Sequence, residues 1–98
     1  MNESPGIIQK RCESPTTLGD RTACTRGVVG YYMYRFEYIP LMTYCEAIKE
    51  MPRRDTCYDA MFDMIIDGDH PQDPREVCEK NNPSLCSNEY VRYLKKRE

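Results

Sequence analysis

Tryptophan is absent from this chain of 98 residues, which also has only two phenylalanines and one histidine. A thiol enzyme needs a base beside its cysteine, but His70 lies in the polar run DGDHPQDP, where we expect a solvated loop. No two cysteines have a CxxC spacing, and the closest pair, Cys78 and Cys86, is eight residues apart, which is long for a zinc motif. We therefore predict no catalytic residues, no cofactor and no metal site, and a protein that is not an enzyme.

Long apolar runs and a basic surface are also lacking. No run approaches the ~18 apolar residues that can span a bilayer, so we expect no membrane insertion. The first ten residues, MNESPGIIQK, lack the charged start and the apolar stretch of a translocation signal, and we interpret the chain as a mature one. With a formal net charge of −2, the chain has no basic excess to neutralise phosphates, so we expect no nucleic-acid partner.

Cysteine, by contrast, is abundant. Six cysteines in so short a chain, an even number, are typical of a disulfide framework in an oxidising compartment. A chain of this length forms one domain with a thin hydrophobic core, which covalent cross-links can support. We therefore predict a single disulfide-rich domain over residues 1–98, with a flexible N-terminal tail at 1–11, in a secreted, extracellular protein.

The cysteine positions indicate an internal repeat. The successive intervals are 12, 21, 12, 21 and 8 residues, which gives a period of 33 for Cys12, Cys24, Cys45, Cys57, Cys78 and Cys86. The first cysteine of each pair precedes a glutamate. After the second cysteine, apolar residues occur at offsets i, i+1, i+3 and i+4 in all three copies, as on one helical face. We therefore predict three units of ~33 residues.

The segment GYYMYRFEYIPLMTYC at residues 30–45 is ambiguous when it is taken alone. Its aromatic residues alternate as in a half-buried strand, whereas the corresponding segments CYDAMFDMIIDG and CSNEYVRYLKKRE favour helix. We therefore predict a helix over 28–38, in a unit whose longer helix begins at its second cysteine. A strand is the alternative.

Two further helices are expected around the remaining cysteines. The stretch LMTYCEAIKEM continues as a helix until Pro52, which cannot extend it. Another helix begins with Asp73 as its cap and Pro74 in its first turn. The expected fold is therefore all-α, a small disulfide-stapled domain of three helical hairpins.

Helical hairpins bring the two cysteines of each unit near one another. The favoured bridges are therefore Cys12–Cys24, Cys45–Cys57 and Cys78–Cys86. Six cysteines permit 15 pairings, so crossed bridges stay open.

Parts of the chain resemble Kunitz inhibitors. Pro15 and Gly19 precede Cys24, YMYRFEYIPLMTYC is similar to that family's aromatic hairpin, and PREVC to the start of its C-terminal helix. The resemblance implies a modified Kunitz-like α+β fold and a divergent serine-protease inhibitor, with Thr25 and Arg26 at the reactive loop. Kunitz inhibitors have their last two cysteines four apart, and insect odorant-binding proteins, which are similar in being small, helical and triply bridged, also contain such a pair. None occurs here, so we assign no family.

The aromatic segment is also the best candidate for a binding surface. Tyrosine and arginine are enriched in interfaces, since a tyrosine buries a large area at low entropic cost. If residues 28–39 form one helix, its shared face carries Val28, Tyr31, Tyr32, Arg35, Phe36 and Ile39. The predicted partner-binding residues, closer to solvent or at the border of that face, are Met33, Tyr34, Arg35 and Tyr38.

Charged residues form three local groups. Asp59, Asp63 and Asp67 recur every fourth residue and would form an acidic ridge on a helix. Arg53–Arg54 form a basic corner, and Lys95–Arg97 a basic tail. We interpret these groups as solvated faces that complement each other.

Small secreted disulfide domains without catalytic groups mostly act by binding. We therefore expect a non-enzymatic protein that binds an extracellular protein partner, as an effector, toxin, ligand or inhibitor. The alternative is a carrier of a small apolar ligand, in a cavity lined by tyrosines and by the pliable side chains of Met33, Met42, Met51, Met61 and Met64.

Overall fold

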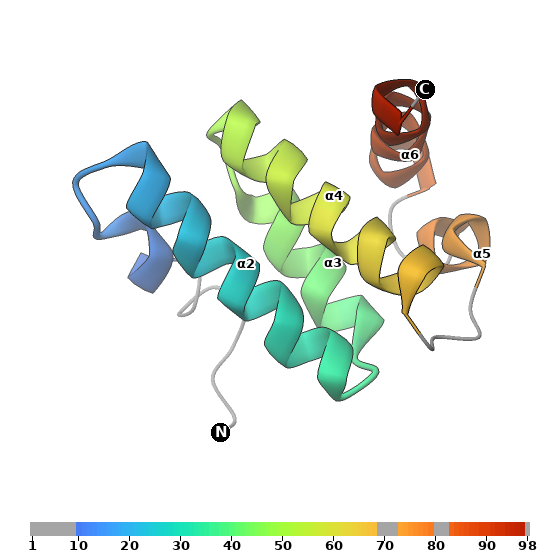
Figure 1. The fold of residues 1–98 in the computed structure, drawn as a ribbon, viewed down its shortest axis with the longest axis horizontal. Coiled ribbons are helices and arrows are strands. Elements are labelled where there is room, and N and C mark those ends of the chain that lie inside the picture. The colour runs from blue at the N-terminus through green and yellow to red at the C-terminus, as the bar shows by residue number, and fades with distance from the viewer. Residues whose placement is uncertain (1–9, 69–72, 80–82, 98) are drawn as a thin grey trace.

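A computed structural model describes residues 10–68, 73–79 and 83–97, which form helices joined by short turns (Figure 1). The helices are α2 (Leu18–Tyr34), α3 (Tyr38–Ala47), α4 (Met51–Asp67), α5 (Pro74–Glu79) and α6 (Pro83–Arg97), and residues 10–13 are also helical. The part of the chain that the structure describes contains no strand. The predicted all-α fold is therefore confirmed, and the alternative Kunitz-like α+β fold is wrong.

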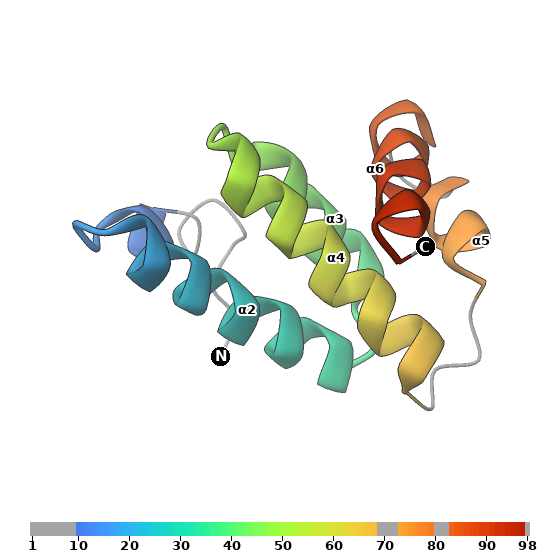
Figure 2. The same ribbon diagram turned by 45° about the horizontal axis from the view of Figure 1, so that its top comes forward.

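Helix α4 lies at the centre of the molecule. It packs against α2, α3, α5 and α6. In Figures 1 and 2, α2 lies on one side of α4, α3 runs alongside both, and α5 and α6 lie on the other side. Helices α2, α3 and α4 therefore pack against one another as a group of three, to which α4 attaches the C-terminal pair.

Helix α2 begins earlier than the sequence suggests. Thr17 caps it, because the N–H of Asp20 donates to Thr17 Oγ1 at 3.1 Å, and Asp20 adds a favourable negative charge in the first turn. This cap starts the helix at Leu18, before Cys24. The predicted helix over 28–38 is correct in type and wrong in its bounds, and the helix does not begin at the cysteine.

Pro52 begins a helix and does not end one. Helix α3 ends at Ala47, and Pro52 lies in the first turn of α4, where its missing N–H costs no intrahelical hydrogen bond. The prediction that the preceding helix continues to Pro52 is therefore wrong. The cap of α5 is confirmed, since the N–H of Arg75 donates to Asp73 Oδ1 at 2.9 Å.

The core lies between α4 and the helices around it. The buried residues of α2 have the spacing of one helical face and are Thr25, Val29, Tyr32 and Met33. The predicted packing face, which contained Val28 and Arg35, is wrong. The face of α2 that packs against the other helices is shifted around the helix by about one residue and contains Val29 and Met33. Other fully buried side chains include Leu41, Met42, Tyr44, Met61 and Phe62.

The three favoured disulfides are confirmed. Cys12 is bonded to Cys24, Cys45 to Cys57 and Cys78 to Cys86, so each bridge closes one predicted unit and none joins two units. Helices α2 and α4 each contain 17 residues, and their first residues, 18 and 51, are 33 apart. Helix α6 is shorter, with 15 residues. The structural equivalence of all three units stays a prediction.

Candidate protein-binding surface

The structure separates the four predicted partner-binding residues. Tyr34, the last residue of α2, is 85% exposed, and Arg35 is exposed beside it. Tyr38 begins α3 and is half-buried. Met33 is fully buried, so the prediction that it lies closer to solvent is wrong. The reason is that Met33 lies on the same face of α2 as Val29, which belongs to the core.

A residue with a left-handed backbone ends α2. Phe36 has a φ of 58°, and it is the one non-glycine residue of the described chain with a positive φ. The N–H of Glu37 donates to the carbonyl of Tyr32, and that of Phe36 to the carbonyl of Met33, both at 3.0 Å. These two bonds form a Schellman motif, whose left-handed position is usually glycine. A phenylalanine there costs roughly 1–2 kcal/mol.

Large apolar side chains are exposed at this corner between α2 and α3. Phe36 is 57% exposed and Ile39 is 55% exposed, next to the more exposed Tyr34. We define the corner surface as Tyr34, Arg35, Phe36, Tyr38 and Ile39.

The sequence-based prediction missed two members of the corner surface. It placed Phe36 and Ile39 on the buried face, which is wrong because α2 ends before them. The signal that could have revealed them is Pro40. A proline is tolerated in the first turn of a helix, so Pro40 indicates a new helix that starts near Tyr38.

Glu37 and Tyr31 orient the Arg35 side chain of the corner surface. The Arg35 Nε donates to Glu37 Oε1 at 2.5 Å, and the Arg35 guanidinium carbon lies 5.5 Å from the centre of the Tyr31 ring. The hydrogen bond and charge of Glu37 raise the pKa of Arg35, so this side chain stays cationic. Because both partners are exposed, the pair contributes little to stability and mainly orients Arg35.

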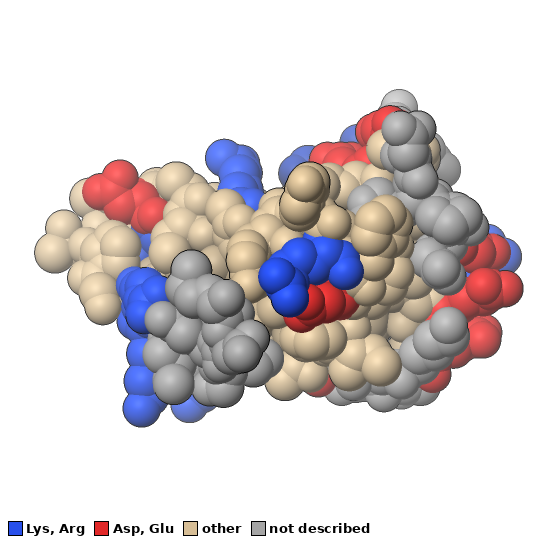
Figure 3. Space-filling view, turned by 90° about the horizontal axis from the view of Figure 1, so that it is seen from below, with Lys and Arg blue, Asp and Glu red and all other residues tan. Residues whose placement is uncertain are grey.

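Figure 3 shows the molecule from below, the side toward which α2 ends in Figure 1. Uncharged residues cover a broad area of this face, and a basic and an acidic group lie together within it. Acidic residues gather toward one end of the view. This face is therefore mainly uncharged, as the core of a protein interface is.

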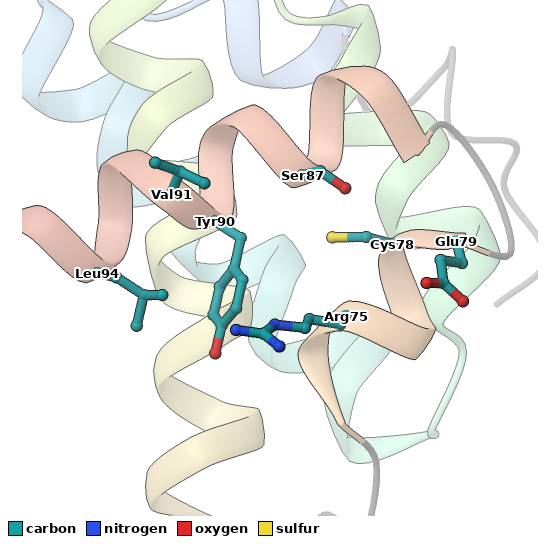
Figure 4. Close-up of a pocket in the computed structure, with 7 residues that line it drawn as sticks. All are labelled: Arg75, Cys78, Glu79, Ser87, Tyr90, Val91 and Leu94. Carbon is teal, nitrogen blue, oxygen red and sulfur yellow. The ribbon is translucent and has the colours of Figure 1, made fainter.

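A groove lies between α5 and α6 (Figure 4). Its volume is about 190 Å³, and its lining residues are Arg75, Cys78, Glu79, Ser87, Tyr90, Val91 and Leu94. Pockets for drug-sized ligands have volumes of roughly 300–1,000 Å³. This groove is therefore large enough for a side chain and too small for such a ligand.

The structure contradicts one prediction for the charged groups and confirms another. Arg53 is 1% exposed and pairs with Glu50 at 3.3 Å and Glu13 at 3.7 Å, so the prediction of a solvated basic corner is wrong for this residue. The predicted complementarity is confirmed for the acidic ridge and the basic tail, since Lys96 Nζ donates to Asp59 Oδ2 at 3.3 Å.

Other chemistry finds no support in the described residues. Over residues 10–68, 73–79 and 83–97, no group of three acidic, histidine or cysteine side chains could hold a metal ion. None of the helices there is both long and apolar enough to cross a membrane. His70 and residues 1–9 of the predicted tail lie outside the described residues, so those predictions stay predictions.

Comparison with protein-family models, with curated proteins and with solved structures gave no match.

Proposed function

We propose that this chain is a secreted, non-enzymatic protein that binds an extracellular protein partner through the corner surface. The observation that carries the proposal is Phe36, which is exposed and also occupies a strained backbone position that glycine fills better. Strained residues cluster at functional sites, because folding alone does not favour them.

The energetics of Phe36 point away from a structural role. Burial of a phenylalanine side chain stabilises a fold by roughly 1.5–3 kcal/mol, but a side chain that remains 57% exposed obtains only part of this. The backbone cost at this position offsets much of what remains. Burial against a partner would cover the exposed part of the Phe36 side chain.

The composition of the corner surface suits a protein partner. Tyrosine and arginine are the residue types that dominate binding hot spots, and Tyr34 and Arg35 adjoin Phe36. A complementary partner would present an apolar pocket with polar groups at its rim. The Arg35–Glu37 pair can form hydrogen bonds with those polar groups. Secretion is supported by the three disulfides, which form and persist in oxidising compartments.

The test compares two sets of exposed positions. The oxidised chain, immobilised, is incubated with extracellular fluid from the organism that produces it, and the retained protein is identified and its Kd is measured. The double variant Tyr34→Ser and Phe36→Asn removes both aromatic rings, while asparagine tolerates a left-handed backbone. We expect this variant to raise the Kd about tenfold or more.

Leu18→Ser is the matched control, because Leu18 is an exposed apolar residue at the opposite end of α2 from Tyr34, roughly 24 Å along the helix. It should leave the Kd unchanged. Equal binding by the wild type and the double variant, or an equal loss with Leu18→Ser, would contradict the proposal. Circular dichroism of each variant establishes that it is folded.

The two other functions predicted from the sequence gain no specific support. Met33, Met42 and Met61 are fully buried in the core. A pocket of about 450 Å³ at the C-terminal end of α4 is lined by one methionine, Met64, together with Asp63, Asp67 and Gly68. Thr25, one of the two residues that the Kunitz resemblance implied for a reactive loop, is buried within α2. Binding of an apolar probe and titration of trypsin-like proteases with Arg26→Ala remain their direct tests.

A further inference from the structure

The contact between α4 and α6 contains more acidic than basic groups. The Arg92 side chain on α6 pairs with three carboxylates, at 3.4 Å for Asp55, 2.6 Å for Asp59 and 3.3 Å for Glu89, and Lys96 also pairs with Asp59. Three carboxylates therefore face two cations. Full ionisation would leave one negative charge in excess among these ion-paired groups.

The excess falls on groups that are shielded from water. Glu89 is 6% exposed, and its Oε2 atom is buried with no hydrogen-bond partner in the described structure. Asp55 Oδ1 is buried and equally lacks a hydrogen bond there. The Arg92 Nε lies near both carboxyl groups but donates only to Glu89, at 3.3 Å. A buried oxygen without a donor makes ionisation of its carboxyl group costly, so this arrangement favours another proton.

Arg92 Nε lies 3.4 Å from Asp55 Oδ1 and 3.3 Å from Glu89 Oε1, so the two carboxyl groups are neighbours between which a hydrogen bond can form. Two carboxyl groups can form that bond only when one of them carries a proton. Burial and then the Asp55 carboxyl raise the pKa of Glu89, and Arg92 opposes them. One proton would thus balance the charge of the cluster and supply the missing donor.

We propose that Glu89 and Asp55 share one proton at the contact between α4 and α6, and that its loss as the pH rises loosens this contact. The C-terminal hairpin, defined as α5 and α6 with the Cys78–Cys86 bridge, is the part that this loss releases. No disulfide joins this hairpin to the other helices, so its attachment depends on noncovalent packing against α4. The proton site thus acts as a pH-sensitive latch.

Other charged groups lie near the Glu89–Asp55 pair. Burial and then the charges of Glu46 on α3 and of Glu89 raise the pKa of the Tyr58 hydroxyl on α4, and the charge of Arg54 opposes them. Arg26 of α2 lines a groove with Asp59, Asp63 and Lys96. Arg75 and Glu79 of α5 line the groove of Figure 4, where Arg75 lies beside Tyr90 and Glu79 lies at the other end, near Cys78. The cation that pairs with both Asp55 and Glu89 is Arg92.

The sign of the pH effect follows from the raised pKa of Glu89. A carboxyl group whose pKa is higher in the folded than in the unfolded state stabilises the fold below its unfolded value, about 4.3. That stabilisation is lost as the pH rises through the folded value. Each unit by which the folded pKa exceeds the ordinary one changes the folding equilibrium tenfold.

The experiment measures the unfolding midpoint in guanidinium chloride between pH 5 and 9, for the oxidised wild type and for Glu89→Gln. The glutamine mimics the neutral acid, so we expect its midpoint to stay constant while the wild-type midpoint falls. Glu76→Gln, on an exposed position of α5, is the matched control and should fall as the wild type does. A wild-type midpoint that does not fall, or the same fall in Glu89→Gln, would overturn the proposal.

Two measurements on the wild type do not depend on a folded variant. The carboxyl carbon of Glu89, followed by NMR, should titrate above the ordinary glutamate range, and titration within that range would overturn the shared proton. Amide protection factors of α6 should decrease at high pH more than those of α2. An equal decrease in both helices would overturn the local release of the hairpin.

Discussion

The ion pairs on the two sides of α4 differ in their balance of positive and negative charge. Toward α2, the ion pairs join two cations to two carboxylates, and these residues are Arg21, Arg53, Glu13 and Glu50. Toward α6, two cations meet three carboxylates. A balanced contact tolerates full ionisation, whereas an unbalanced and partly buried one favours a bound proton.

The difference gives the two contacts opposite responses to pH. Arg21 donates two hydrogen bonds to Glu50, at 3.1 and 2.8 Å, and this bonding lowers the pKa of Glu50. A lowered pKa stabilises the fold above the ordinary carboxyl value, and that stabilisation is lost as the pH falls through the folded value. Glu89, with its raised pKa, behaves in the reverse way.

The largest expected effect comes from the aromatic cluster at the α6 side of α4. Phe62 is fully buried, and its ring centre lies 5.0 Å from that of Tyr90 and 5.4 Å from that of Tyr93. Phe62→Ala should lower the free energy of unfolding by about 3–5 kcal/mol, because it removes apolar contacts and leaves a cavity. Equilibrium denaturation measures this, with the exposed Ile66→Ala as control. A cost no larger than that of the control would show that packing does not hold this contact.

Glu50→Gln is the counterpart of the Glu89 substitution on the other side of α4. At pH 7 it should lower the denaturation midpoint, by less than Phe62→Ala does, because the charge-assisted bonds from Arg21 are weakened. Below the folded pKa of Glu50 the two chains should become equally stable. A midpoint difference that grows on acidification would reverse the assigned sign.

The smallest effect on stability is expected at the corner surface, remote from both contacts. Phe36→Gly should raise the free energy of unfolding by about 0.5–1 kcal/mol, since glycine adopts the left-handed backbone without strain and only part of this gain is lost to its freedom in the unfolded chain. Thermal denaturation of the oxidised protein measures it. The same variant should bind the partner less well. A more stable variant that binds equally well would show that the strained Phe36 is not kept for partner binding.

Much of the fold was predictable because its causes are local. The spacing of the cysteines indicated the three bridges, and the periodic apolar residues after the second cysteine of each pair indicated helices. Asp73 and Pro74 marked a helix start that the structure confirms. Each of these features acts over one or two turns of chain, so sequence reasoning can detect it.

The candidate site was predicted only in part, for a physical reason. Tyr34 is exposed as expected, but the end of α2 depends on a left-handed phenylalanine where a glycine would have signalled it. Without that end, Phe36 and Ile39 were assigned to the wrong face and Met33 to the surface. The buried pairing of Arg53 likewise depends on Glu13, a distant residue.

The sequence alone determined an all-helical, triply bridged chain, because disulfide spacing and helical periodicity are short-range properties. The tertiary structure decided which stripe of each helix is covered and which charges meet at the two sides of α4. Those outcomes depend on the packing of helices against each other, where the environment of a carboxyl group is set by residues far away in the chain. Glu89 illustrates this, since its raised pKa arises from burial and from Asp55 on another helix.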